Sequence, residues 1–343
     1  METVFIDGSM GEGGGQILRT SLALSCITGK SLHIEKIRAA RRNPGLAKQH
    51  LSCIQAACQI SNGKSQGAVQ GSQVLDFQPG SIHCGDFSFD IGSAGSASLV
   101  IQTILPALLL ADKSSTITVS GGTHNPLAPP FDFIHETFLP TIATAGFHAN
   151  CKLEKFGFFP VGGGKITLRT QPWQKQKHQI IDLCEPSSNF KLDARIYTAR
   201  LPIKIAQRQK KLLQQVSVDI DNIGHIEVTD SDGPGTAVCI RICGIDRTIV
   251  FTAFGKRGKP SESVIGDVVG LTKSFLGSRA AVDRFLADQL LIYMAIANRG
   301  CYTTDRISSH TETNMEVIKK FLLVDFIAQC QGNLFRVSCQ SDQ

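Results

Sequence analysis

The residues best suited to chemistry on a phosphate lie in two short stretches near opposite ends of the chain. The first, residues 11–16, reads GEGGGQ and falls between a strand-like and a helical pattern. Glycines let backbone amides approach an anion, and a helix terminus adds partial positive charge. The dinucleotide-binding pattern fails because residue 16 is Gln, and the P-loop pattern fails before Gly164. Considered without other residues, the stretch is best interpreted as a tight turn. Glu12, an acid in a glycine turn that faces phosphate, fits a metal-ion ligand.

The second stretch is residues 306–314, which read RISSHTETN. Thr313 followed by Glu316 forms a capping-box pattern, so we expect a helix to start near Thr313. His310 would then lie just before the positive end of that helix, where phosphate is attracted. An imidazole placed there is a candidate nucleophile. An isolated histidine in a loop is more often inert, so the position alone does not decide.

A group of basic and amide side chains follows the glycine turn within forty residues. Guanidinium groups fit phosphate oxygens bidentately, so together with Glu12 the group could bind a phosphate end. Residues 36–48 hold five bases and no acid, a pattern that charge alone explains equally well as a solvated face. The group comprises Arg19, Arg38, Arg41, Lys48 and Gln49.

Two apolar segments carry polar residues that need an explanation. Gln102 is a lone amide in the largely apolar residues 99–110, and a buried amide must find partners. Asp288 and Gln289 stand side by side in the apolar residues 282–297. In both places an internal hydrogen bond or a wet helix face competes with contact to a nucleotide.

The elements that would position these residues recur along the chain. A glycine-rich turn, an apolar helix and a short strand occur over residues 11–37 and again over residues 92–119. A third apolar helix, residues 282–297, precedes a short strand at residues 301–303. In residues 46–60 the apolar positions have helical spacing, and His50 shares their face, so we expect it to be packed rather than catalytic. Repetition of one unit favours an α/β body built of similar modules.

The middle of the chain has a different pattern. Residues 171–179 are polar and include Trp173, Lys175 and Lys177. A Lys/Gln-rich helix over residues 205–215, alternating strands over 237–242 and 248–254, and a basic loop over 255–260 follow. We therefore predict a small inserted domain at residues 181–278, with residues 1–180 and 279–343 forming the large domain.

Composition excludes several classes of protein. The 343 residues are 42% apolar and 19% charged, too apolar for a disordered chain. The longest apolar run, residues 101–111, is far short of the ~20 residues that a membrane span requires, so no membrane partner is expected. The net charge, 35 − 29 = +6, is compatible with a polyanionic partner.

The cysteines and the first residues indicate a cellular compartment. Eleven cysteines are scattered singly without a C-x-x-C pair, and the first residues lack the basic-then-apolar pattern of a secretory signal. We expect a cytoplasmic protein with reduced, mostly buried thiols. The two closest pairs, Cys239 with Cys243 and Cys53 with Cys58, lack histidine partners, so zinc is not expected.

Taken together, these residues resemble the RNA 3′-terminal phosphate cyclase family over essentially the whole chain. Several long motifs occur in the family's order, which is far more specific than one glycine loop. They are DGSMGEGGGQILR at 7–19, IRAAR at 37–41, PGL at 44–46, KQHL at 48–51, IGSAGS at 91–96, SGGT at 120–123, APP at 128–130, GFFPVGGG at 157–164 and LADQ at 286–289.

The resemblance implies a fold and a reaction. The α/β fold would consist of a large domain of three repeated βαβαββ modules with a smaller inserted α/β domain. The activity would be ATP-dependent: a histidine attacks the α-phosphorus of ATP, AMP passes from the histidine to an RNA 3′-phosphate, and the neighbouring 2′-hydroxyl closes a 2′,3′-cyclic phosphodiester. Covalent catalysis of this kind splits a difficult exchange into easier displacements.

The resemblance also implies roles for particular residues. His310 matches the nucleophile, and Glu12 matches the ligand of a Mg²⁺ or Mn²⁺ ion near the triphosphate. Nucleotide binding falls to Gln102, Phe285, Leu286, Ala287, Asp288 and Gln289. Contacts to the phosphates and the RNA end fall to Arg19, Arg38, Arg41 and Gln49. Three positions depart from the family pattern: Phe156 before the GFFPVGGG motif, Ala40 where a glycine is expected, and Glu312 after the histidine.

Two other functions compete with this interpretation. Cyclase-like relatives act in ribosome assembly as RNA-binding or processing factors and lack the histidine, whereas this chain has His310, Glu12 and Arg19. Enolpyruvyl transferases have a distantly similar modular architecture but need no covalent AMP, so His310 with Asp288 and Gln289 argues against them. The sequence leaves open the physiological RNA, the preferred metal and the oligomeric state.

Overall fold

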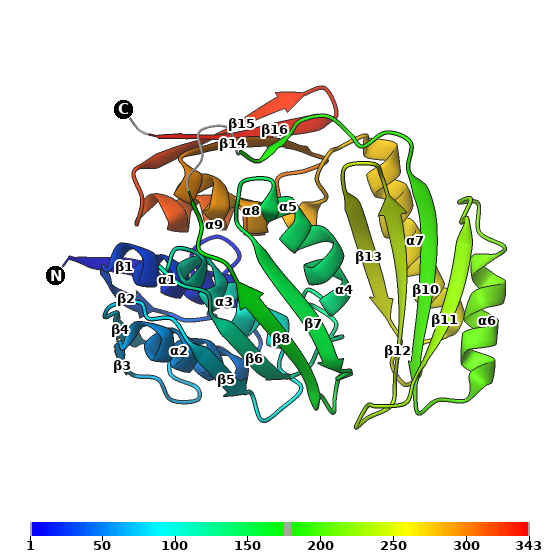
Figure 1. The fold of residues 1–343 in the computed structure, drawn as a ribbon, viewed down its shortest axis with the longest axis horizontal. Helices are drawn as coiled ribbons and strands as arrows, with labels where there is room; N and C mark the ends of the chain where they lie inside the picture. The colour runs from blue at the N-terminus through cyan, green and yellow to red at the C-terminus, as the bar shows by residue number, and fades with distance from the viewer. Residues whose placement is uncertain (1, 175–179, 342–343) are drawn as a thin grey trace.

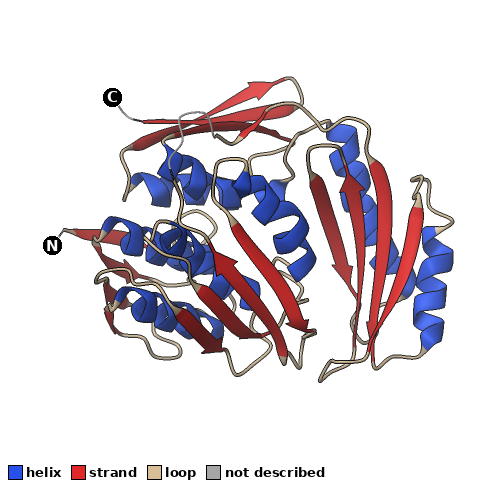
Figure 2. Cartoon of the chain, viewed as in Figure 1, coloured by secondary structure: helices blue, strands red, loops and turns tan. Residues whose placement is uncertain are grey.

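A computed structural model of the chain describes residues 2–174 and 180–341. Within these residues the strands form four sheets of four strands each, and helices pack against the sheets (Figures 1 and 2). The predicted α/β class is confirmed. Lys175 and Lys177 of the polar segment lie outside the described residues. No helix in the described ranges combines the length and the apolar character that crossing a membrane demands.

The first sheet is built from the N-terminal residues. β1 and β2 pair in parallel, and β4 and β3 add antiparallel strands, giving the order β1-β2-β4-β3. The helix after the glycine turn ends at Gly29, which takes the left-handed conformation expected of a helix C-terminus. The elements are β1 (Thr3–Asp7), α1 (Gly15–Thr28), β2 (Ser31–Glu35), α2 (Lys48–Ser61), β3 (Lys64–Gln66) and β4 (Leu75–Gln78).

The second sheet has the same succession of pairings. β5 and β6 are parallel, and β8 and β7 follow as antiparallel strands. A π-helical turn, η1, joins two short helices beside this sheet. The elements are β5 (Asp86–Asp90), α3 (Ala97–Leu109), β6 (Thr116–Gly121), α4 (Phe131–Phe133), η1 (Ile134–Phe138), α5 (Leu139–Ala143), β7 (Ala149–Lys155) and β8 (Gly164–Thr170).

Another sheet with this succession brings distant parts of the chain together. β9 pairs in parallel with β14, although β10 to β13 lie between them in the sequence. β16 and β15 complete the order β15-β16-β14-β9. The elements are β9 (Asp182–Leu183), α8 (Arg284–Ala297), β14 (Arg299–Thr304), α9 (Ser309–Lys319), β15 (Val324–Gln331) and β16 (Leu334–Ser341).

The remaining sheet, β11-β10-β12-β13, lies to one side with α6 and α7 against it (Figure 1). The predicted Lys/Gln-rich helix corresponds to α6, and the predicted alternating strands correspond to β12 and β13. The elements are β10 (Lys191–Ala199), α6 (Ile203–Leu213), β11 (Asn222–Val228), β12 (Gly235–Cys243), β13 (Thr248–Phe254) and α7 (Ser261–Ser278).

The helices that carry the predicted site residues lie inside, between the other three sheets (Figure 1). α1 packs against α3 and α9, and α8 packs against α9 and β14. The side chains of α3 and α8 are buried on almost every face, because sheets or helices surround them. Polar residues inside these helices must therefore bond to one another, and this requirement positions the site.

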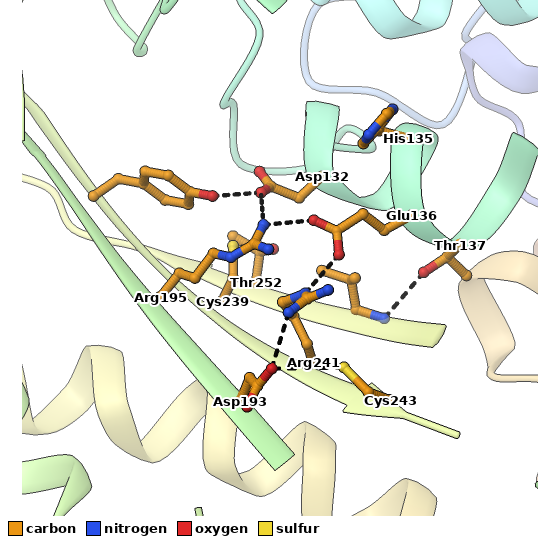
Figure 3. Close-up of polar contacts among 12 residues, drawn as sticks. Asp132, His135, Glu136, Thr137, Asp193, Arg195, Cys239, Arg241, Cys243 and Thr252 are labelled. Carbon is orange, nitrogen blue, oxygen red and sulfur yellow. Dashed lines mark hydrogen bonds and ion pairs between the residues drawn. The ribbon is translucent and has the colours of Figure 1, made fainter. Parts of the chain in front are cut away.

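A polar cluster joins η1 to the strands of the β10–β13 sheet (Figure 3). Glu136 lies between two arginines: Arg195 Nη1 donates to its Oε1 and Arg241 Nε to its Oε2, both at 2.5 Å. Arg241 also contacts Asp193 at 3.1 Å. All three charged groups of this bridge are at least two-thirds buried, so the bridge links η1 directly to β10 and β12.

Candidate active site

The glycine turn docks onto the first turn of α9. Gly11 has φ +51°, and a Cβ at this position would lie 1.9 Å from the Thr313 hydroxyl oxygen, so the close approach requires glycine. The Glu12 amide donates to that same hydroxyl at 3.0 Å. As a result, Glu12 Oε1 lies 3.8 Å from His310 Nδ1. Residues almost three hundred positions apart thus meet at one site.

The predicted start of α9 is wrong. The helix begins at Ser309, with Ser308 as N-cap, and Ser308 Oγ accepts from the Thr311 amide at 3.1 Å. Thr313 is interior: its hydroxyl donates to the Ser309 carbonyl at 2.6 Å and accepts from Glu12. Thr313 is therefore engaged by the glycine turn instead of capping the helix. His310 still lies at the positive end of the helix, but in its first turn, and Glu312 beside it faces solvent.

Three helices contribute to a hydrogen-bonded chain that ends on His310. Gln16 Nε2 in α1 donates to Asp288 Oδ2 in α8 at 2.8 Å, and Gln16 Oε1 lies 2.6 Å from His310 Nδ1 in α9. Because Asp288 takes the N–H side of the amide, the oxygen side faces the imidazole. His310 Nδ1 then carries the hydrogen, and Nε2 keeps its lone pair.

Asp288 is enclosed within the helices. Burial raises the pKa of its carboxyl to about 7, with Asp283 adding to the increase and the Gln16 hydrogen bond opposing it. Its Oδ1 is buried and has no hydrogen-bond partner among the described residues. The backbone around it is braced, since Asn314 Nδ2 donates to the Asp288 carbonyl and Thr20 donates to Asn314, both at 2.7 Å.

Arginines gather beside this chain. Arg41 pairs with Glu12 through Nη2 and Oε2. Burial lowers the pKa of Arg19, and the charge of Arg41 adds to that decrease. In the described ranges the Arg19 guanidinium makes no hydrogen bond or ion pair, although Glu12 and Asp288 lie close enough to act on its charge. A partly buried guanidinium with unused donors is suited to an anion such as phosphate.

Arg38 and Gln49 lie in the adjoining segment and are partly occupied. Arg38 Nη1 donates to the Gly45 carbonyl at 2.7 Å, and Gln49 Oε1 accepts from the Ser96 amide at 2.8 Å. His50, the residue after Gln49, has a pKa lowered to about 3 by burial and by the charges of Arg19 and Arg38. The expectation that His50 is packed is confirmed, because it is buried and accepts from the Ala47 amide at 3.2 Å.

The residues predicted to bind a nucleotide lie on two helices, Gln102 in α3 and residues 285–289 in α8. Gln102 donates to Gln289 Oε1, and Gln289 Nε2 donates to the Phe285 carbonyl at 2.7 Å. The Phe285 ring is 45% exposed, whereas Leu286 and Ala287 are fully buried in the core. Only Phe285, Gln289 and Gln102 thus present groups that a base could contact.

Glu12 has one oxygen suited to a cation. Its Oε1 is buried and makes no hydrogen bond within the described residues, while Oε2 is paired with Arg41. A single carboxylate oxygen next to a phosphate-binding group fits Mg²⁺ or Mn²⁺, which take their other ligands from phosphates and water. The residues present therefore fit the predicted metal.

Gln16 was missed as a functional residue. In the sequence analysis Gln16 counts only as the residue that breaks the glycine pattern. It lies in the first turn of α1, close to Arg19 and Thr20. Its polar side chain at the start of an otherwise apolar helix was the available signal. Its partners could not be read from the sequence, because they lie 272 and 294 positions away.

Comparisons with known proteins identify the relatives of this chain. A family model described as RNA 3′-terminal phosphate cyclase matches residues 10–328. The chain is 42% identical over 339 residues to the RNA 3′-terminal phosphate cyclase of Koribacter versatilis, covering 98% of this chain and 95% of the relative. It is 43% identical over 336 residues to that of Ralstonia nicotianae, covering 98% and 96%. It is 38% identical over 342 residues to that of Pseudomonas fluorescens, covering 99% and 98%.

Proposed function

The chain belongs to the RNA 3′-terminal phosphate cyclase family, and we propose that it converts an RNA 3′-phosphate into a 2′,3′-cyclic phosphodiester through a covalent histidine–AMP. The membership rests on the family model and on relatives matched over nearly their full length. ATP and an RNA bearing a 3′-phosphate are the substrates that this reaction requires. The observation that carries the proposed mechanism is the Asp288–Gln16–His310 chain of hydrogen bonds.

This chain of hydrogen bonds supports His310 as the nucleophile. The Nδ1–H is held by Gln16, so the lone pair of Nε2 points away from the amide. His310 is 47% exposed, which leaves the ring accessible to a substrate. When Nε2 attacks phosphorus, the positive charge that develops on the ring is stabilised by the Gln16 oxygen and by the nearby Glu12 carboxylate.

The reaction proceeds in three displacements. First, His310 Nε2 attacks the α-phosphorus of ATP, forming an N–P bond as pyrophosphate leaves. Second, an oxygen of the RNA 3′-phosphate attacks that phosphorus, which breaks the N–P bond and gives RNA-adenylate. Third, the 2′-hydroxyl attacks the RNA phosphorus, AMP leaves and the hydroxyl proton is released. The transfer of AMP gives the RNA phosphorus a leaving group that a phosphate monoester lacks, and the covalent histidine–AMP divides that transfer into two displacements.

The arginines supply charge to the reacting phosphates. We assign Arg19, Arg38 and Arg41 to phosphate oxygens, with Gln49 shaping the adjoining turn. The partly buried, unpaired guanidinium of Arg19 supports the innermost position for this residue. Glu12 would hold the divalent ion, which supplies further neutralisation of phosphate charge when bound.

The base of ATP is assigned to the exposed part of α8. Phe285 offers an aromatic face for stacking, and the amides of Gln102 and Gln289 offer donors and acceptors. The resemblance also implicates Leu286 and Ala287. Their side chains are buried in the core, so they would hold α8 in place and would not contact the base.

The division into domains is part of the same proposal. Three sheets share the succession of one parallel and two antiparallel pairings, which supports three βαβαββ modules in residues 1–180 and 279–343. The β11-β10-β12-β13 sheet with α6 and α7 supports an insert within residues 181–278. β9 lies at the start of this range but pairs with β14, so the insert proper would begin after it.

The mechanism is tested by covalent labelling. The protein is incubated with α-labelled ATP and Mg²⁺ or Mn²⁺, denatured and separated on a gel. We expect an acid-labile label that is absent from His310→Ala and present in His148→Ala, a control that removes another exposed histidine. Full labelling of a folded His310→Ala protein would contradict the assignment. Absence of label from the folded parent, with RNA still bound, would favour the non-catalytic alternative.

A further inference from the structure

Two cysteines from distant parts of the chain lie in contact. The Sγ atoms of Cys184 and Cys301 are 3.0 Å apart, although 117 positions separate the residues. β9 and β14 bring them together, since Asp182 faces Cys301 in the parallel pair and Cys184 follows directly after β9. Both side chains are partly buried, so a small molecule can reach them while a protein cannot easily do so.

The surroundings of the pair favour reaction at Cys301. Arg336 Nη2 in β16 lies 3.8 Å from Cys301 Sγ, and Asp182 Oδ1 accepts from the same thiol at 3.3 Å. The thiolate is the reactive form of a cysteine, and the Asp182 carboxylate, which already accepts from the Cys301 thiol, can receive its proton when the sulfur attacks. Burial raises the pKa of Cys184 to about 12, and the contact with Cys301 adds to the increase. Cys184 is therefore held as the thiol.

We propose that Cys184 and Cys301 are a redox-active pair that hydrogen peroxide oxidises to a reversible disulfide between β9 and β14. The Cys301 thiolate attacks one peroxide oxygen, the O–O bond breaks, and hydroxide leaves with a sulfenic acid on Cys301. The Cys184 sulfur then attacks the Cys301 sulfur and loses its proton, and the sulfenic hydroxyl leaves as water. Two thiols and one peroxide thus give one disulfide and two waters.

The geometry requires little movement. A disulfide needs its sulfur atoms about 2 Å apart, so the present separation must close by about 1 Å. The backbones are already neighbours in a sheet, hydrogen-bonded through the β9–β14 pairing and by Thr303 Oγ1 to the Cys184 carbonyl at 3.0 Å. The bond would close a loop of the chain that contains all of β10 to β13. It would also join the end of β9, the strand that leads into this loop, to β14.

A metal is the competing occupant. One ligand atom each from Asp182, Cys184 and Cys301 lie within 4.8 Å of one another. A structural zinc site takes four ligands, and Arg336 places a positive charge against one of these three sulfur and oxygen donors. This positive charge repels a dication, so we favour the redox pair.

Mass spectrometry tests the proposal on the full chain. Reduced protein, freed of reductant, is treated with peroxide, denatured and alkylated. We expect Cys184 and Cys301 to escape alkylation, a crosslinked peptide pair containing both residues, and reversal by dithiothreitol. Cys330, which is exposed elsewhere, serves as the reference for an ordinary thiol. Alkylation of both Cys184 and Cys301 after peroxide has oxidised Cys330 would overturn the proposal.

Variants separate the pair from the other thiols. Cys301→Ser and Cys184→Ser should each lose the crosslink, and Cys330→Ser should keep it. Oxidation should raise the thermal midpoint of the parent by on the order of 5 °C and leave that of Cys301→Ser unchanged. Zinc that co-purifies with the reduced parent at one ion per chain, and is lost in Cys184→Ser, would assign a metal site instead and refute the redox pair.

Discussion

Gln16 determines the orientation of His310 because its own amide is already held by Asp288. An imidazole fixed at Nδ1 has one nitrogen left for substrate, and a small rotation of the ring would misdirect that lone pair. Reaction rates fall steeply with such misplacement. We therefore propose that Gln16 is a positioning residue, whose effect should appear in the rate of adenylation and not in the stability of the fold.

We predict that Gln16→Ala lowers the rate of adenylation on the order of 100-fold, because the ring loses its anchor. The pH–rate profile should also change, since Glu12 is then the nearest partner of Nδ1. Labelling with α-labelled ATP under single-turnover conditions gives the rate. Gln66→Ala, which changes an exposed amide in β3, is the control. Equal rates for the two variants would rule out the positioning role.

The ionisation of Asp288 gives a prediction of stability against pH. The folded protein holds this proton up to about pH 7, whereas the unfolded chain loses it near pH 4. Between these values the folded state binds more protons, so the contribution of Asp288 to stability is present below about pH 4 and is lost as the pH rises through 7. Asp288→Asn removes this dependence.

Denaturant unfolding of the parent and of Asp288→Asn at several pH values measures the effect. The free energy of unfolding of the parent should fall by up to about 4 kcal/mol, relative to that of the variant, as the pH rises from 4 to 8. The introduced amide retains an oxygen that can accept from Gln16, which keeps the packing matched. Parallel curves for the two proteins would show that Asp288 is not buried as described.

Much of the site was predictable at the level of single residues. Glu12, Arg41 and His310 were identified by residue type and motif, and the structure brings them together. Gln16 and its link to Asp288 could not be inferred, since a hydrogen bond across 272 positions leaves no periodic signal in one sequence. The predicted start of α9 was wrong because a tertiary contact occupies Thr313, and local pattern cannot reveal such competition.

At the scale of elements, short strands and helices are placed by a few buried polar contacts. η1 departs from regular helix where it meets β10 and β12, and π-helical turns often occur where a side chain must be aimed. Here the turn aims Glu136 at Arg195 and Arg241. Helices with continuous apolar burial, such as α3 and α8, were predictable, whereas the short α4–η1–α5 succession has no period long enough to recognise.

We predict that Glu136→Ala lowers the free energy of unfolding by about 3 kcal/mol, because two partly buried guanidiniums lose their counterion. Chemical denaturation measures the loss. Glu154→Ala is the control, since Glu154 pairs with a largely exposed lysine and should change stability by less than about 1 kcal/mol. A loss no larger than that of the control would show that the bridge does not secure the β10–β13 sheet.

At the scale of the whole molecule, the charge balance favours a polyanion without specifying one. The net charge of +6 is small for 343 residues, so its placement matters more than its size. Arg19, Arg38 and Arg41 are concentrated around one turn, and only Glu12 forms an ion pair with any of them in the described part of the chain. An RNA end docked there would displace counterions from about three phosphates.

Binding of RNA should therefore weaken with salt. For a single strand and about three neutralised phosphates, affinity should fall roughly 20-fold between 50 and 200 mM salt. Arg38→Gln should reduce the slope of log affinity against log salt by about 0.7, whereas Arg208→Gln, which removes an arginine of α6 paired with Glu262, should not. Fluorescence anisotropy of a labelled RNA 3′-phosphate measures both slopes. Identical slopes for parent and Arg38→Gln would remove Arg38 from the RNA contact.

The joining of Gln16 to His310 across 294 positions also has a consequence for synthesis on the ribosome. At about 5 to 20 residues per second, some 15 to 60 seconds pass between translation of the two codons. Until then the nascent chain holds its glycine turn without a nucleophile. A product that stops before residue 310, at a damaged message or a stalled codon, consequently lacks the proposed nucleophile and, by the proposed mechanism, cannot take AMP from ATP.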